Sequence, residues 1–138
     1  MSREVVQLSG FSVQYPQGVS AALSQADLSV KAGESVLVTG PSGSGKSTLA
    51  LCLTGVIPSA VYARLSGGIR VCGVEPAAQG VYDMASRVGL VQQDAEGQFC
   101  TMRVEDEVAF GPENLMCSPA EIERRVGRAL ELADAGHL

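Results

Sequence analysis

Apolar and polar positions alternate loosely at the start of the chain, a pattern typical of strands. The alternation ends at a turn signal, Pro16-Gln17-Gly18. A second extended stretch, residues 26–30, ends at Lys31-Ala32-Gly33-Glu34. The apolar positions of the first stretch are Val5, Leu8, Phe11, Val13 and Tyr15. Residues 1–34 are therefore expected to form a pair of antiparallel strands.

Two short apolar runs, residues 35–39 and 87–91, are instead typical of strands buried on both faces. The first run continues directly into a glycine-rich segment, after which residues 46–56 predict a helix that ends near Gly55 and Pro58. The elements expected between the two runs are a loop at 59–68, a strand at 69–74 and a short helix or turn at 80–86.

The final third of the chain predicts helices. Residues 104–110 favour a short helix that Gly111-Pro112 ends. Ser118-Pro119-Ala120-Glu121 then combines an N-cap serine, a proline at the first helical position and a glutamate at the third, which is a capping box. Apolar positions follow at helical spacing and predict one buried face; they are Ile122, Val126, Leu130 and Ala133. This order of elements indicates an α/β protein.

Composition and charge narrow the classes of function. Hydrophobic residues make up 46% of the chain, as in ordinary globular proteins, and the formal net charge of −5 argues against nucleic acid as a partner, because phosphate backbones select basic surfaces. No apolar stretch approaches the ~20 residues of a transmembrane helix, and no apolar segment typical of a signal peptide follows Arg3. The cysteines form no CxxC pair and the only histidine is His137, which favours free thiols over a zinc site.

The chemistry is concentrated in residues 40–47, GPSGSGKS, which fit the phosphate-binding pattern G-x-x-x-x-G-K-[ST]. Glycines let the backbone curl so that successive N–H groups point toward phosphate oxygens, and the helix that begins there adds its positive end. Lys46 is expected to reach the β- and γ-phosphates, and the Ser47 hydroxyl to ligate Mg²⁺. A match between a buried strand and an apolar helix is the context that this motif requires.

The longer segment GPSGSGKSTL, residues 40–49, resembles the Walker A sequence of ABC transporter ATPases. The resemblance implies ATP and Mg²⁺ as cofactors and matches Tyr15 to the aromatic residue that stacks on adenine, a contact worth ~1–3 kcal/mol. A tyrosine that only covers the core at a strand end is the alternative. The ATP-binding residues implied are Tyr15, Gly40, Pro41, Ser42, Gly43, Ser44, Gly45, Lys46, Ser47 and Thr48.

Residues 87–93, RVGLVQQ, resemble the strand that leads to the family's Q-loop glutamine. Gln93 is the better match and Gln92 the alternative, and two exposed polar residues after a strand are the plainer reading. The resemblance gives Lys46 and Gln93 catalytic roles, and it places Ser47 and Gln93 at Mg²⁺.

Residues 94–115, above all VEDEVAFGPEN, look like the corresponding region of cobalt/nickel and energy-coupling-factor (ECF) vitamin importers. Ala95 stands where proline is usual and Cys100 where an aromatic residue is common, so the individual transporter stays open. The resemblance implies that this region docks a basic coupling helix of a membrane subunit. The acidic residues concerned are Glu105, Asp106 and Glu107, for which a solvated helix face is the alternative.

A second glycine-rich segment, Leu65-Ser66-Gly67-Gly68-Ile69, is similar to the family's LSGGQ signature. It lies before the Q-loop rather than after the helical subdomain, so it is expected to be a turn leading into a strand. The true signature, the Walker B aspartate with its catalytic glutamate, and the switch histidine find no match in the 138 residues. The chain alone is therefore expected to bind ATP weakly, to aggregate and not to turn ATP over.

The expected fold is an α/β P-loop core of the ABC cassette type. Its parts are an antiparallel β region (1–34), the core up to the Q-loop (35–93) and the start of a helical subdomain (94–138). The resemblance implies the ATP-binding subunit of an importer for a vitamin or metal ion, peripheral at the cytoplasmic face of the cell membrane. Its partners would be a second cassette and an integral membrane subunit, with no nucleic acid. A soluble ABC ATPase and a nucleotide-binding module without turnover are the alternatives.

Overall fold

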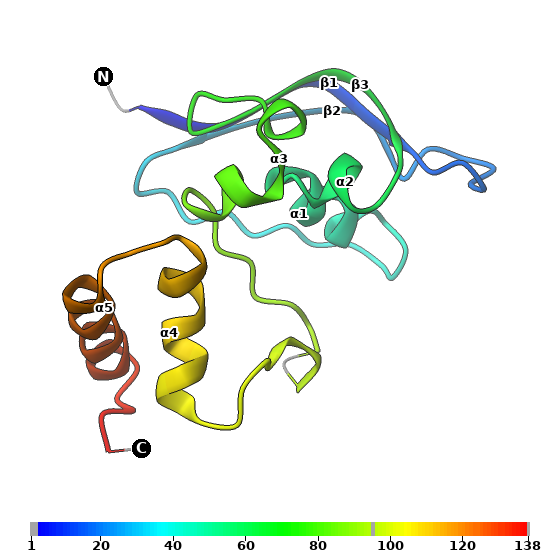
Figure 1. Ribbon diagram of the computed structural model, residues 1–138. Helices are drawn as coiled ribbons and strands as arrows, with labels where there is room; N and C mark the ends of the chain where they lie inside the picture. The colour runs from blue at the N-terminus through cyan, green and yellow to red at the C-terminus, as the bar shows by residue number, and fades with distance from the viewer. Residues whose placement is uncertain (1–2, 95, 138) are drawn as a thin grey trace. The chain divides into compact units, whose positions relative to one another are not determined.

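The computed structural model describes residues 3–94 and 96–137. The chain forms two compact units, Met1–Leu90 and Val91–Leu138 (Figure 1). No helix in the described part of the chain has the length and apolar character needed to cross a membrane. Ala95, one of the two departures from the importer pattern, lies outside the described residues.

The first unit is built on a three-stranded antiparallel sheet of order β2-β1-β3. Its strands are β1 (Glu4–Gln14), β2 (Leu23–Lys31) and β3 (Arg64–Val71). The expected pairing of the first two strands is confirmed, with Leu8 opposite Leu28 and Phe11 opposite Ala26. The long β1 is central, so both of its edges carry ladder hydrogen bonds.

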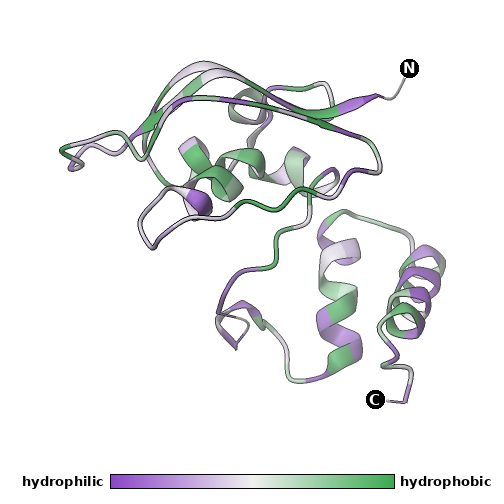
Figure 2. Ribbon diagram, turned by 180° about the vertical axis from the view of Figure 1, so that it is seen from behind, coloured by the Kyte–Doolittle hydropathy of each residue, from purple (hydrophilic) through white to green (hydrophobic). Residues whose placement is uncertain are grey.

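Three helices lie against one face of this sheet, as Figures 1 and 2 show. They are α1 (Lys46–Leu53), α2 (Val56–Ser59) and α3 (Pro76–Ala85). Apolar side chains of the sheet and the helices meet in one core, whose buried members are Leu8, Phe11, Val13, Cys52, Ile57, Ala63, Ile69, Val71 and Met84. Burial raises the pKa of the Cys52 thiol to about 11, so this cysteine packs as a small apolar group.

The predicted helix over residues 46–56 is confirmed as α1 but ends earlier, at Leu53. The Thr54 hydroxyl donates to the carbonyl oxygens of Ala50 (3.3 Å) and Leu51 (3.1 Å) and closes α1. A new helix then starts at Val56. Helix α3 begins at Pro76, earlier than the expected 80–86, and is kinked at Gly80.

The expected loop at 59–68 is also wrong, because β3 starts at Arg64 and pairs with the second half of β1. A bulge between Ser9 and Ser12 brings Gly10 against Gly67. Gly67 has φ +78, and a Cβ built on it would lie 2.3 Å from the Gly10 carbonyl oxygen, which only glycine tolerates. The LSGGI segment is therefore the paired interior of a strand rather than a turn, and its glycines serve the sheet.

Neither of the two runs predicted as buried strands forms a strand. In residues 35–39 the side chain of Leu37 is 86% exposed, and in residues 87–91 that of Val91 is 89% exposed. A strand buried on both faces obtains its hydrogen bonds and its burial from neighbouring strands. The sheet found among the described residues holds only β1, β2 and β3, so neither run has such a neighbour there.

The second unit contains a short 3₁₀ helix η1 (Glu96–Gln98) and two α-helices, α4 (Val104–Asn114) and α5 (Pro119–Leu132). Helix α4 continues through Gly111-Pro112, where the sequence predicted its end. Proline removes a single N–H from the ladder, and the Asn114 side-chain amide donates to the Phe110 carbonyl oxygen at 2.8 Å in the same turn.

Helix α5 begins as predicted, with the Ser118 hydroxyl accepting from the Glu121 N–H at 3.4 Å and Pro119 at the first position. The Glu121 carboxylate accepts from Arg124 and Arg125, both at 2.7 Å. These bonds, those to Arg124 first, lower the pKa of Glu121 to about 2. The predicted buried face is only half-buried, because neither α4 nor α5 contains a fully buried residue among those described.

Candidate functional site

The glycine-rich loop, residues 40–45, leads directly into α1 and sets the position where that helix starts. Gly45 is the N-cap residue of α1, in the left-handed conformation with φ 88. A Cβ built on Gly45 would lie 2.3 Å from the Ala22 carbonyl oxygen, so the start of α1 touches the backbone just before β2. Glycine at this position therefore allows both the turn and the close approach.

The N-terminus of α1 has no side-chain cap and no acidic residue in its first turn. The first N–H groups of a helix lack partners within the helix, and the helix dipole makes this end positive. Ser47 lies exposed in this first turn, directly after Lys46. A helix end of this kind is suited to bind an anion such as phosphate.

Lys46 bends back over the loop that precedes it. Its ammonium nitrogen Nζ donates to the carbonyl oxygens of Gly40 and Pro41, both at 2.8 Å, and to the Ser44 hydroxyl at 3.2 Å. None of the ion pairs found in the described residues uses Lys46, so its charge is not neutralised by a carboxylate. The loop therefore presents a positive charge held by neutral oxygens beside the N-terminus of α1.

Tyr15 follows β1 and reaches α1 through its hydroxyl, which lies 3.1 Å from Oγ1 of Thr48. Thr48 is buried, with 8% of its surface exposed, whereas Tyr15 is half-buried and packs against the core. The structure thus brings Tyr15 together with α1, the helix that follows the glycine-rich loop, although the two sequence segments are far apart. The alternative prediction, that Tyr15 covers the core at a strand end, is confirmed in part, because the side chain does pack against the core.

The predicted glutamines belong to the second unit. Gln93 is exposed in the loop before η1, and the backbone N–H of Gln92 donates to the Gln98 side-chain oxygen at 3.1 Å. Gln92 is thus tied locally within its loop, while the side chain of Gln93 is open to solvent.

The acidic residues at the start of α4 differ from one another. The Glu107 carboxylate accepts from the N–H groups of Cys100 and Thr101, each at 2.9 Å, and from the Thr101 hydroxyl at 3.0 Å. These bonds, first that to the Thr101 backbone, lower the pKa of Glu107. Glu105 pairs with Arg103 at 3.0 Å, and Asp106 is exposed. Glu107 is therefore not simply a solvated residue on the helix face, because its carboxylate binds the loop that precedes α4 at Cys100 and Thr101.

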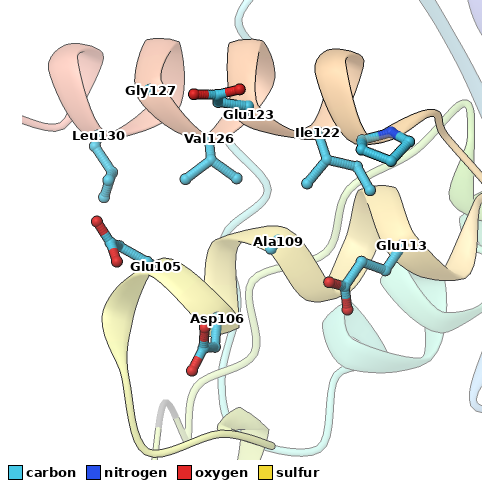
Figure 3. A pocket seen from close by; sticks show the side chains of 10 residues that line it. Glu105, Asp106, Ala109, Glu113, Ile122, Glu123, Val126, Gly127 and Leu130 are labelled. Carbon is cyan, nitrogen blue, oxygen red and sulfur yellow. The ribbon is translucent and has the colours of Figure 1, made fainter.

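A groove of about 560 Å³ lies between α4 and α5. Figure 3 shows Ile122, Val126 and Leu130 of α5 pointing toward α4 across it. Carboxylates line the groove as well, and they are Glu105, Asp106, Glu113 and Glu123. The sequence had suggested only the first two of these. The sequence signal for Glu123 is its helical spacing from Val126 and Leu130 of the apolar stripe. The signal for Glu113 is its helical spacing from Asp106 and Ala109.

Comparison with known proteins bears on the whole chain. Residues 23–138 match the family described as ABC transporter. A Methanosarcina mazei protein, provisionally named ABC transporter ATP-binding protein, is 40% identical over 134 residues, which are 96% of this chain and 23% of that protein. One from Enterococcus faecalis with the same name is 35% identical over the full chain, which corresponds to 24% of its own length. The chain spans about a quarter of these curated relatives, and it belongs to the ABC transporter ATP-binding family.

Proposed function

We propose that this chain binds ATP with Mg²⁺ at residues 40–48 and Tyr15. The observation that carries the proposal is the convergence of an uncapped helix N-terminus and the Lys46 ammonium on one glycine-rich loop. The Lys46 ammonium exchanges loop carbonyl oxygens for β- and γ-phosphate oxygens, which are charged and therefore stronger acceptors. The first N–H groups of α1 donate to the phosphates as well.

The donor set also fits a magnesium ion. Ser47 offers an exposed hydroxyl beside Lys46, and Mg²⁺ takes few protein oxygens when phosphates supply others. The metal ion neutralises charge that develops on the phosphates. Tyr15 contributes a ring for the base, and the Gln93 amide is proposed to respond to the γ-phosphate and metal, as the resemblance implies.

In the longer protein we propose the ATP-binding subunit of an ECF- or cobalt-like importer for a vitamin or metal ion. It would act as one of two paired cassettes, held at the cytoplasmic face of the membrane by integral membrane subunits. The acidic and apolar groove between α4 and α5 supports this proposal, because a basic helix with an apolar ridge complements it in charge and polarity. Gln93, in the same unit, would pass the state of the nucleotide to that partner.

Titration with a fluorescent ATP analogue tests the nucleotide site. Lys46→Ala removes the ammonium from the cradle and is expected to weaken binding by ~1.5–3 kcal/mol, the range for hydrogen bonds to charged groups. Lys31→Ala is the matched control. Lys31 is the exposed last residue of β2, and its substitution removes the same charge outside the proposed phosphate site. Equal losses of ATP affinity in the two variants would mean that only the net charge of the chain matters, and would contradict the P-loop assignment.

Gln93→Ala tests the coupling role in a polypeptide of the relatives' length, assembled with its membrane subunits. ATP affinity is expected to stay within about twofold, while transport-coupled hydrolysis falls about tenfold or more, since the exposed Gln93 amide is proposed to sense the nucleotide rather than to hold the phosphates. Gln92→Ala, which keeps its backbone hydrogen bond to Gln98, is expected to leave both quantities unchanged. A lower melting temperature with unchanged coupling would assign Gln93 a structural role instead.

A further inference from the structure

The polar contact between Tyr15 and Thr48 joins two elements that are remote in sequence. Their hydroxyl oxygens lie 3.1 Å apart across 33 positions of the chain, at a partly buried place. Thr48 directs its side chain inward, as its 8% exposure shows, although it follows Ser47 in the first turn of α1. The Thr48 hydroxyl therefore contacts the tyrosine rather than the open side of the loop.

The backbone around Tyr15 is fixed as well. The N–H of Gly18 donates to the Tyr15 carbonyl oxygen at 3.0 Å, and the Gln14 side-chain amide donates to the Gly18 carbonyl oxygen at 3.0 Å. The ring is thus held at its backbone by a turn and at its far end by α1. A phenol ring restrained at both ends keeps one orientation, and a ligand that stacks on it loses less conformational entropy on binding.

We propose that Thr48 is a positioning residue for base recognition, whose side-chain hydroxyl holds the Tyr15 ring in place for adenine. The inference rests on the proposed ATP site and adds a link within it. Helix α1 receives the phosphates at its N-terminus, and through Thr48 the same helix sets the position of the ring that receives the base. The spacing between base and phosphate sites is therefore fixed by one helix and one hydrogen bond.

The same geometry explains why Tyr15 both covers the core and serves the ligand. Its packing against the core and its bond to Thr48 restrain the ring, while the half-buried side chain keeps part of its surface open. Phenylalanine at this position would stack equally well, since every base presents a π-face to any aromatic ring. Only the hydroxyl distinguishes tyrosine from phenylalanine, and in the structure the Tyr15 hydroxyl forms its hydrogen bond with Thr48.

A double-mutant cycle in a polypeptide of the relatives' length tests the proposal with two probes, ATP and inorganic tripolyphosphate. Thr48→Val removes the hydroxyl at constant shape, Tyr15→Phe removes the other half of the bond, and Thr48→Ser restores the donor and acceptor. Both single variants are expected to weaken ATP binding about two- to tenfold, the factor for one neutral hydrogen bond, and the double variant no further. Tripolyphosphate affinity is expected to stay unchanged, because every variant keeps the Lys46 ammonium and the backbone N–H groups of α1 that are proposed to receive the phosphates. Thr48→Ser is expected to bind ATP as the parent protein does.

Saturation-transfer NMR supplies a readout that a merely structural role would not move. The transfer from protein to the adenine protons, relative to the ribose protons, is expected to fall in Thr48→Val and in Tyr15→Phe. Additive losses in the double variant, or equal losses for ATP and tripolyphosphate, would overturn the proposal. If Thr48→Val does not fold, Tyr15→Phe probes the same bond from its more exposed side.

Lys46→Ala separates this inference from the proposed function. Loss of tripolyphosphate binding in Lys46→Ala, together with no effect of Thr48→Val and Tyr15→Phe on ATP, would keep the phosphate site and refute only the role of Thr48. Unchanged tripolyphosphate binding in Lys46→Ala would instead refute the proposed function itself.

Discussion

The two units of this chain are stabilised in different ways. In the first, sheet and helices enclose a core in which Phe11 and Val13 are almost completely buried, with 1% and 0% of their surface exposed. In the second, α4 and α5 contain no fully buried residue among those described, and α5 is stabilised by its Ser118 cap and by the ion pairs of Glu121 with Arg124 and Arg125. Figure 2 shows this contrast in colour, with α1 mostly hydrophobic and α5 mixed.

The difference in burial indicates which unit suits phosphate binding and which suits the docking of a partner. A phosphate site needs donors held in fixed positions, and α1 obtains that rigidity from the core beneath it. A docking surface needs apolar area that is not yet covered, and the groove between α4 and α5 retains such area.

The largest expected effect comes from one substitution made in both units. Phe11→Ala empties a buried site and is expected to lower the free energy of unfolding by about 3–5 kcal/mol. Phe110→Ala, on α4, removes the same atoms from a side chain that is 43% exposed, and about 1 kcal/mol is expected. Urea unfolding followed by circular dichroism measures both. Equal losses would contradict the contrast between the units.

The bulge in the sheet gives the next effect. Gly67→Ala places a Cβ 2.3 Å from the Gly10 carbonyl oxygen in a left-handed conformation, and a loss of about 1–2 kcal/mol is expected from the backbone alone. Gly68→Ala is the neighbouring control: its Cβ would meet nothing closer than 3.7 Å, and about 0.5–1 kcal/mol of gain is expected. Thermal unfolding compares them, and similar melting temperatures would mean that the close approach is absent in solution.

The smallest effect is a pH dependence in the second unit. The pKa of Glu121 is lowered to about 2 by its bonds to Arg124 and Arg125, so its stabilising contribution is complete above its ordinary pKa near 4.5. That contribution is lost as the pH falls from about 4.5 to about 2, so the protection of the α5 amides from exchange, taken relative to the intrinsic exchange rate at each pH, is expected to decrease over this range. Glu121→Gln removes this part of the decrease. Glu107, also lowered in pKa, acts in the same direction through the loop before α4.

The sequence predicted well what depends on local pattern. The alternation before Pro16 predicted β1, and Ser118-Pro119 predicted the start of α5, because strand alternation and helix caps are set by neighbouring residues. The glycine-rich loop leading into α1 was also placed correctly as a segment. The roles of Tyr15, Lys46 and Gln93 stay predictions that the experiments above address.

The errors concern what depends on distant partners. The apolar runs at 35–39 and 87–91 have the composition of buried strands, yet strand pairing is decided by neighbours that a local pattern does not contain. The start of β3 at Arg64 was missed for a related reason, since its glycines are typical of turns until Gly10 of β1 opposes them. The bond from Tyr15 to Thr48 joins residues whose closeness only the fold determines.

Mapping of amide chemical shifts shows directly whether phosphate binds at the glycine-rich loop that leads into α1, above the buried core of the first unit. Tripolyphosphate added to the ¹⁵N-labelled chain is expected to shift the amides of residues 40–48 and to leave those of α5 unmoved, although Ser118 also begins a helix. ATP is expected to shift the same amides and those next to Tyr15. Shifts concentrated in the second unit, or none in residues 40–48 at saturating ligand, would contradict the account.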